Sequence, residues 1–416
     1  MNLNRRSTAL CRPGPREGAW VARLAMLGLL VIMDGFEASV SLAAEAIISA
    51  RYRGEASGAF VDTTPPASFC SQWPGFCAGG MRTVGLPITY DKLVYKGAPT
   101  NLLDRFYIKL PDARVIDVIN QATGERYRLE FEIIAISQRT SVSDGPPATT
   151  STDVQGGCSY RQSQGALNWV DYLWMVSAPQ NPTACHVAWQ GNWQLPNPGP
   201  HPHRTDRMGI GYRLKALPPG KMKQGLYRGS LHYSVGDGAD FDLGAGIQNL
   251  NSSSLTIHFE LDVQHTFAID FAPGSDRAVL EPPGGWLQWL NGGRAPQRLY
   301  RDLPFRLWSS GPFKVYKLCQ YDVASHCGIR NQREDLVSVT VGLSLPGDIE
   351  HEGDQARRLT IPTGREKALP FEPVTPAHNR PGQLHFQVER EDVRDMLEHA
   401  GSTYQGQVTV VFDADV

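Results

Sequence analysis

"TYQGQVTVVFDADV" (403–416) alternates between two kinds of residue with a period of two. Apolar or small side chains occupy every second position from Tyr404 to Val416, and mostly Gln, Thr and Asp stand between them. Successive side chains of a strand point to opposite faces, so the pattern predicts a β-strand with one buried face. Chain ends are usually frayed. We therefore expect this final strand to have a specific role.

Length and composition favour a two-domain globular protein. The chain has 416 residues, more than one ordinary core holds. Its 41 Gly and 30 Pro favour many turns over long helices. A formal net charge of −2 gives no electrostatic reason to expect nucleic-acid binding.

Residues 1–43 have the pattern of a secretory signal peptide. Arginines precede the apolar run "LAMLGLLVIM" (24–33), and small residues follow it. The run is too short to span a bilayer. The pair Arg5-Arg6 leaves twin-arginine export open, and a start codon placed too early is a second alternative. We expect cleavage near Ala43 and export of the rest of the chain as a soluble protein.

Six of the seven cysteines lie beyond this segment, in three close pairs. Six cysteines allow fifteen connectivities, and pairing between nearest neighbours is the simplest of them. No C-x-x-C pair and no zinc-finger spacing occurs, so we expect disulfides in an oxidising compartment rather than a metal site. The predicted disulfides are Cys70–Cys77, Cys158–Cys185 and Cys319–Cys327.

Short β runs separated by turn residues fill the chain from Ala44 onward. Examples are "RYRLEFEIIAIS" (126–137), "LTIHFELDV" (255–263) and "LVSVTVGLSL" (336–345). One short helix is predicted over 389–401, with Gly401 at its end. Many strands and few helices indicate an all-β protein built from β-sandwiches.

A weak internal repeat suggests where the domains divide. "YRGSLHYSV" (227–235) and "YQGQVTVVF" (404–412) share the pattern Tyr-x-Gly followed by alternating apolar residues. If each copy is a late strand of one sandwich, the first domain covers 44–250 and the second covers 251–416. The strand 255–263 would then open the second domain.

Three stretches resemble one known family. They are "LKALPPGKMKQGLYRGSLHYSVGDGADFDLG" (214–244), "LTIHFELDV" and the terminal Y-x-G-x-V-T-V-V-F-D. Together they resemble the tip adhesins, or pilus initiators, of colonisation-factor and cable-pilus type chaperone–usher fimbriae of Gram-negative bacteria (the CblD-like family). The resemblance is strongest over about 200–260 and at the C-terminus, and weak over 44–150.

This resemblance implies two immunoglobulin-like β-sandwiches in tandem. The N-terminal one would bind a host-surface receptor. The C-terminal one would be an incomplete pilin domain, completed by donor-strand exchange. Its partners would be a periplasmic chaperone, an outer-membrane usher and the major pilin, and its location the fimbrial tip. The expected groove walls are Leu255, Ile257, Phe259 and Leu261 on one side and Val408, Val410 and Phe412 on the other.

The resemblance also implies an arginine-containing receptor patch, and anionic sugars favour the bidentate guanidinium. Arg204 and Arg207 follow Trp189 and Trp193 in a loop-rich stretch. Arg161 and Trp169 follow Cys158, and the disulfide Cys158–Cys185 would draw the segments together. We therefore expect Arg161, Arg204 and Arg207 to contribute to receptor binding.

Catalytic and cofactor motifs are few. "HYSVG" lacks the first Gly of G-x-S-x-G, and "HEGDQ" lacks the second His of a zinc protease. Asp237, Asp240 and Asp242 could hold calcium, but turns at a domain junction explain them better. "HPHR" (201–204) could hold a metal through its two histidines, but an exposed proline-rich loop explains it better. We expect no enzyme, metal or cofactor. The alternatives are a secreted β-sandwich carbohydrate-active enzyme with a binding module, and a periplasmic chaperone.

Overall fold

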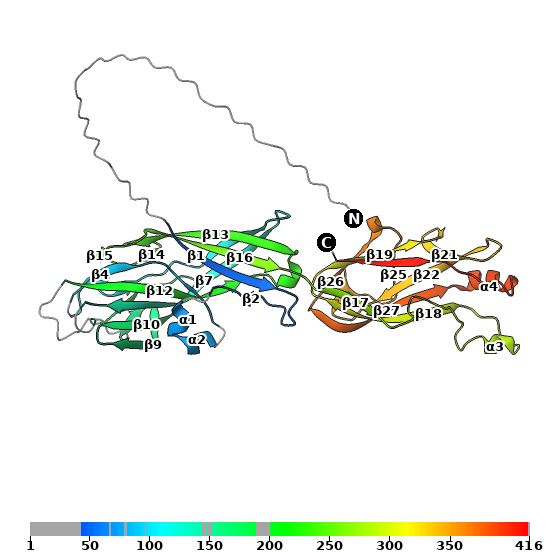
Figure 1. The fold of residues 1–416 in the computed structure, drawn as a ribbon, viewed down its shortest axis with the longest axis horizontal. Coiled ribbons are helices and arrows are strands. Elements are labelled where there is room, and N and C mark those ends of the chain that lie inside the picture. The colour runs from blue at the N-terminus through cyan, green and yellow to red at the C-terminus, as the bar shows by residue number, and fades with distance from the viewer. Residues whose placement is uncertain are drawn as a thin grey trace, which may run out of the picture. The chain divides into compact units, whose positions relative to one another are not determined.

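The computed structural model describes residues 43–65, 68–78, 81–95, 97–143, 147, 152–188 and 200–414. Strands dominate, and they form two β-sandwiches that follow one another along the chain, as predicted (Figure 1). Each sandwich encloses its own cluster of buried apolar side chains. The predicted signal peptide, residues 1–43, lies outside the described residues except for its last one.

Sixteen strands of the first sandwich lie within the described residues. They are β1 (Ala44–Tyr52), β2 (Val61–Asp62), β3 (Arg82–Gly85), β4 (Tyr90–Val94), β5 (Tyr107–Ile108), β6 (Arg114–Asn120), β7 (Arg126–Ser141), β8 (Val154–Gly156), β9 (Cys158–Ala166), β10 (Trp169–Val176), β11 (Cys185–Val187), β12 (His201–Lys215), β13 (Gly225–Gly236), β14 (Phe241–Asp242), β15 (Ile247–Gln248) and β16 (Ser254–Val263).

The long strand β7 is apolar on both faces because each face is covered. One face carries Phe131, Ile133 and Ile136 into the main core. On the other face, Ala135 packs beneath two short helices, α1 (Ser68–Gln72) and α2 (Pro74–Ala78). Trp73, between these helices, is fully buried and donates from Nε1 to Ser137 Oγ (2.7 Å).

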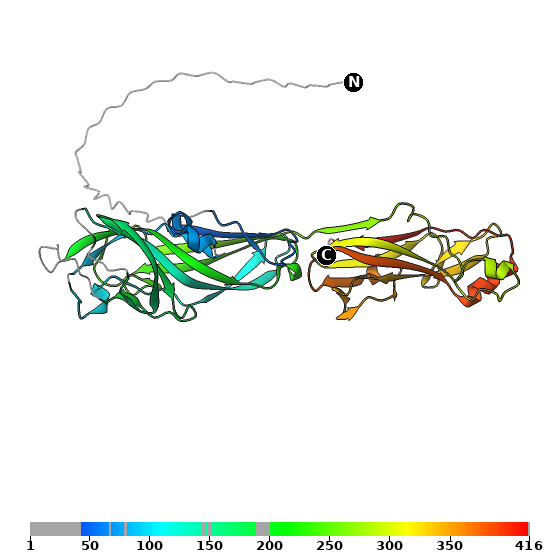
Figure 2. The ribbon, with the colours of Figure 1, turned by 90° about the horizontal axis from the view of Figure 1, so that it is seen from below.

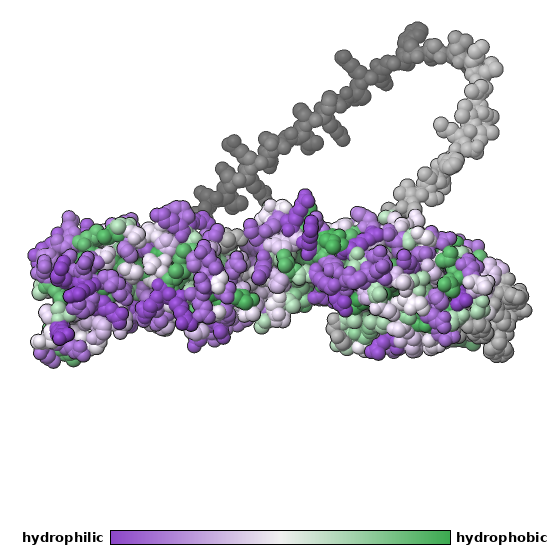
Figure 3. Space-filling view, turned by 180° about the vertical axis from the view of Figure 1, so that it is seen from behind, coloured by the Kyte–Doolittle hydropathy of each residue, from purple (hydrophilic) through white to green (hydrophobic). Residues whose placement is uncertain are grey.

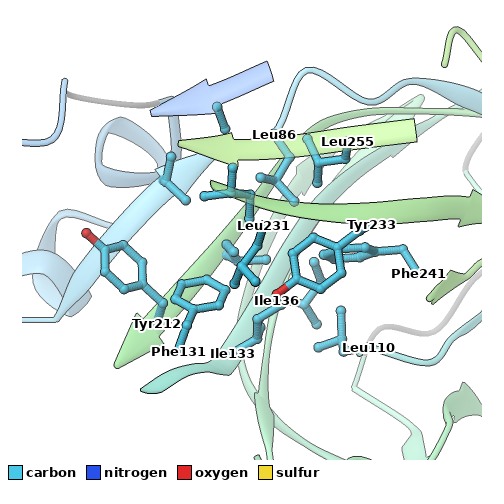
Figure 4. Close-up of a cluster of buried hydrophobic side chains, with 14 of the residues drawn as sticks. Leu86, Leu110, Phe131, Ile133, Ile136, Tyr212, Leu231, Tyr233, Phe241 and Leu255 are labelled. Atoms are coloured by element: carbon cyan, nitrogen blue, oxygen red, sulfur yellow. The ribbon is translucent and has the colours of Figure 1, made fainter. Parts of the chain in front are cut away.

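Strand β16 corrects the predicted domain boundary. It pairs with β13 on one side and with β1 on the other. Its apolar residues Leu255, Ile257, Phe259 and Leu261 are fully buried in the first core, where Leu255 lies among Leu86 and Leu231 (Figure 4). The prediction that 255–263 opens the second domain is therefore wrong. The first sandwich extends to Val263, and the second begins at β17.

Twelve strands and two helices belong to the second sandwich. They are β17 (Phe267–Phe271), α3 (Leu287–Leu290), β18 (Leu299–Ser309), β19 (Phe313–Cys319), β20 (Asp322–Val323), β21 (His326–Arg330), β22 (Leu336–Ser344), β23 (Ile349–His351), β24 (Asp354–Gln355), β25 (Leu359–Thr360), β26 (Leu369–Pro373), β27 (Ala377–Val388), α4 (Arg390–Glu398) and β28 (Val408–Asp413).

Local predictions from the sequence hold in both sandwiches. All three disulfides connect the predicted nearest-neighbour pairs. Helix α4 lies within the predicted range and buries Val393. Gly401 follows it with φ +84°, a conformation that glycine adopts without strain. These features depend on neighbours in the sequence, which is why the sequence predicts them.

Candidate strand-accepting groove

Within the described residues, the second sandwich contains the strand order of an immunoglobulin constant domain except for strand G. β17, β18, β27 and β22 follow one another in one sheet, as strands A, B, E and D do. β19 and β28 are neighbours in the other sheet, as strands C and F are. A complete domain places strand G beside F. Within the described residues no strand pairs with the outer edge of β28, so the position of strand G is open.

The apolar face of β28 is only partly covered. Val408, Val410 and Phe412 pack against the second core, yet all three keep intermediate exposure. The matching face of β16 in the first sandwich is fully buried. Both strands have the same apolar alternation, so the difference lies in what covers them. Among the described residues, β28 has a neighbouring strand on one edge only, namely β19.

The opposite wall of the opening is formed by β17 and the segment that follows it. β17 pairs with β18 up to Phe271 and Phe305. The chain then leaves the sheet over 272–280 and returns at the bridge between Glu281 and Tyr300. Pro273 and Gly274 stand at the point of departure, and such residues disfavour a continuing strand.

An open cavity of about 650 Å³ lies between these two walls. Its floor consists of core side chains from four strands: Leu303, Ile329, Val339, Leu384 and Phe386. Val408 and Val410 line one side, and Phe271, Ala278 and Leu280 line the other. An apolar groove beside an unpaired strand edge can accept an extended peptide as an additional strand.

Phe412 has a different role from the one predicted for it. Its ring contacts those of Phe267 (6.5 Å between centroids), Phe305 (5.8 Å) and Phe313 (6.4 Å). It does not line the cavity. Contacts between aromatic rings at these distances are favourable. This aromatic cluster therefore joins the two sheets beside the groove.

Only some of the predicted groove residues lie in the groove. Val408 and Val410 line it, whereas Leu255, Ile257, Phe259 and Leu261 belong to the first core. Phe271, Leu303, Leu384 and Phe386 were not predicted. Alternation over 299–307 does mark Leu303 as an inward residue of a strand, but alternation alone cannot say which cavity a strand faces.

The three predicted receptor arginines lie on two strands and do not contact one another. Arg204 donates to Thr89 Oγ1 (2.8 Å) and lies 3.4 Å from Asp91. Arg207 and Arg161 are exposed, and neither makes a hydrogen bond or ion pair with another described residue. β7 and β10 separate β12 from β9, so Arg161 lies about 14 Å from the line of β12. Trp189 and Trp193 lie outside the described residues.

Trp169 packs against an arginine that the sequence did not single out. The Arg139 guanidinium lies 3.9 Å from the centroid of its ring. Arg139 also donates from Nε and Nη2 to the two carboxylate oxygens of Asp171, at 2.7 and 2.8 Å. The hydrogen bond to the buried Asp171 raises the pKa of Arg139. This bidentate ion pair rigidifies the sheet face on which Arg204 also lies.

The acidic segment 237–242 forms a turn and bend that lead into the short strand β14. Asp240 accepts from the backbone and hydroxyl of Ser234 (2.8 and 3.0 Å) and pairs with Arg114. Asp242 accepts from the amides of Gly238 and Gly244, both at 2.9 Å. The described residues contain no group of three or more His, Cys, Asp or Glu side chains arranged for a metal ion. These contacts explain the Asp and Gly content without a ligand.

Asp302, His385 and Ser344 meet the distances of a catalytic triad. His385 Nδ1 lies 2.7 Å from Asp302 Oδ1, and Nε2 lies 2.8 Å from Ser344 Oγ. The three residues stand on neighbouring strands, however, and His385 is only 5% exposed. Ser344 Oγ also accepts the Arg358 amide (2.9 Å). A nucleophile needs room for a substrate carbonyl. We therefore interpret the hydrogen bonds among Asp302, His385 and Ser344 as contacts that stabilise the sheet.

No protein-family model matches this chain, and no curated protein matches it. Eight chains of solved structures match. One belongs to a chaperone–tip adhesion subunit pre-assembly complex from the archaic chaperone–usher Csu pili of Acinetobacter baumannii. It is 10% identical to this chain, the alignment covers 89% of this chain and 99% of that one, and the TM-score is 0.22. Among the described residues, no helix is long and apolar enough to cross a membrane.

Proposed function

We propose that this chain is the tip adhesin of a chaperone–usher fimbria, and that a strand from another chain completes its second sandwich. The open position of strand G beside β28 is the observation that carries this proposal. A donated strand would form main-chain hydrogen bonds with β28 and place every second side chain into the groove.

The energetics favour such a strand. Each large apolar side chain that enters the groove contributes roughly 1.5–3 kcal/mol. Each new main-chain hydrogen bond contributes about 1 kcal/mol. These gains must exceed the cost of ordering the incoming segment. Apolar side chains of the donated strand would lie opposite Val408, Val410 and the rim at Gly406.

The identity of the partners rests on the resemblance of 214–244 and of the terminal strand to fimbrial tip adhesins. A periplasmic chaperone would supply the strand first, and the N-terminal segment of the major pilin would replace it at the outer-membrane usher. The signal-like N-terminus accords with export through the periplasm. The chain would then reside at the fimbrial tip on the surface of a Gram-negative cell.

The first sandwich is proposed to bind the receptor rather than to accept a strand. Its last strand, β16, already has β1 as a neighbour, and its core is closed. Its role would be binding of a host-surface glycan, without catalysis. Arg161, Arg204 and Arg207 remain the candidate contacts, and all three are exposed.

A strand fused to the C-terminus of the full chain tests strand acceptance. A loop of about four residues followed by a strand of about eight, alternating Val and Thr, would return antiparallel to β28. We expect the melting temperature of the second sandwich to rise by roughly 10 °C. The control carries the same residues shifted by one position, which turns the apolar face outward. Equal melting temperatures for the two fusions would refute the proposal.

A further inference from the structure

A second cavity continues the groove past the start of β28. It has a volume of about 930 Å³. The residues that line both cavities are Asp276, Ala278, Leu280, Ile329 and Gly406. Because these shared residues include Gly406, just before β28, the two cavities form one continuous depression along the open edge of the sandwich.

Two helices build the walls of this second cavity. Trp286, Trp289 and Leu290 come from α3 and the residue before it, and Met396 and Leu397 come from α4. Both helices lie at the same end of the second sandwich (Figures 1 and 2). Trp286 and Trp289 are 36% and 37% exposed, and Leu290 is 72% exposed. Over much of the face in Figure 3, hydrophobic residues are scattered among hydrophilic ones. Trp286, Trp289 and Leu290 instead gather in one concave site, and a cluster of exposed apolar side chains points to a binding role.

We propose that this second cavity receives a large apolar side chain from the same partner chain that supplies the missing strand. The inference rests on the proposed function, because the strand must lie beside β28 to bring the side chain there. A strand that follows β28 from Asp413 toward Val408 next reaches Gly406, at the rim shared by both cavities. The partner residue at that end of the strand therefore faces the second cavity.

The lining selects an aromatic side chain. Two indole rings offer edge and face contacts to a third ring, and such contacts add to the effect of burial. The Met396 thioether is suited to a contact with the edge of a ring. A small polar residue at the same position would leave these apolar surfaces exposed to water. We therefore expect the partner segment to carry Phe, Tyr or Trp at the end of its strand.

The fused strand described above also tests this site in the full chain. Two fusions share the alternating strand and differ only in the last residue, Phe in one and Ser in the other. We expect the Phe form to melt about 4–8 °C higher, as burial of one large side chain predicts. Leu290→Ser should remove most of this difference. Leu287→Ser is the matched control, because Leu287 is 70% exposed on the same helix and does not line the cavity.

The outcomes separate the two proposals. If the alternating strand stabilises the sandwich but the Phe and Ser forms melt together, the cavity assignment is wrong and strand acceptance stands. The cavity assignment would also be wrong if Leu287→Ser and Leu290→Ser reduced the melting-temperature difference between the Phe and Ser fusions equally. The Phe side chain of the fused strand would then not lie in the cavity. If neither alternating fusion has a higher melting temperature than the shifted control, both proposals are wrong.

Discussion

His203 makes the first sandwich sensitive to acid. The side chain has no exposed surface, and burial lowers its pKa from 6.5 to about 4. In the unfolded chain the ring binds a proton near pH 6.5. The unfolded state therefore binds more protons than the folded state between pH 6.5 and pH 4. The free energy of unfolding falls as the pH is lowered through this window, by roughly 3 kcal/mol.

His203→Gln should remove most of this pH dependence. Gln does not titrate and can still donate to the His201 carbonyl, which lies 3.1 Å from His203 Nδ1. Urea unfolding of the wild type and the variant, at about pH 7 and about pH 4, measures the difference. His232→Gln, at an exposed position in β13, is the control and should keep the wild-type response. An unchanged response in His203→Gln would contradict the assignment.

Arg207 offers a sharper test of receptor binding than Arg204 does. Arg207 has φ +48° at an irregularity of β12, a strained conformation for a side chain with a Cβ. Arg207→Gly removes the guanidinium and relieves that strain, so the fold should not be weakened. We expect Arg207→Gly and Arg161→Ala to lower glycan or cell binding several-fold, about the effect of losing one charge-assisted hydrogen bond. Arg126→Ala, at the far end of β7, is the control. Wild-type adhesion in both Arg207→Gly and Arg161→Ala would show that these two arginines do not contribute to receptor binding.

At the scale of elements, apolar alternation identifies strands and their buried faces but not the sheets they join. β16 and β28 have the same alternation, yet one is internal and the other lies at an edge. One of the two partners of β16 is β1. The hydrogen bond from Ala44 N, at the start of β1, to Ser252 Oγ, just before β16, joins residues that are 208 positions apart. No local signal encodes that distance. The predicted boundary at 250 therefore separated β16 from the core that buries it.

The groove shows the same division between local and distant information. Its β28 wall was predictable because Val408 and Val410 belong to one alternating strand. The other wall was not, because 272–280 leaves the sheet and has no period. The floor comes from four strands that only the fold brings together. Likewise, α1 and α2 are too short to give a helical period, although they pack over Ala135 of β7.

For the whole molecule, the two sandwiches differ in how their last strand is covered. In the first, β1 runs parallel to β16 and places Ala46, Ile48 and Tyr52 in the core. In the second, β19 pairs with one edge of β28, and no described strand pairs with the other edge. Under the proposed function, the first half of the chain is complete by itself and the second half would be completed by a partner strand. This difference accords with a receptor-binding half and an assembly half.

The two halves should therefore respond to different perturbations. The first core and the second core are separate clusters of buried residues. His203 lies in the first sandwich and the groove lies in the second, so acid should lower one calorimetric transition and the fused strand should raise the other. Scanning calorimetry of the full chain, with and without the fusion, at about pH 7 and about pH 4.5, measures both. A fused strand that raised both transitions equally would mean that the sandwiches unfold as one cooperative unit, and the division into a self-complete and a partner-dependent half would then be wrong.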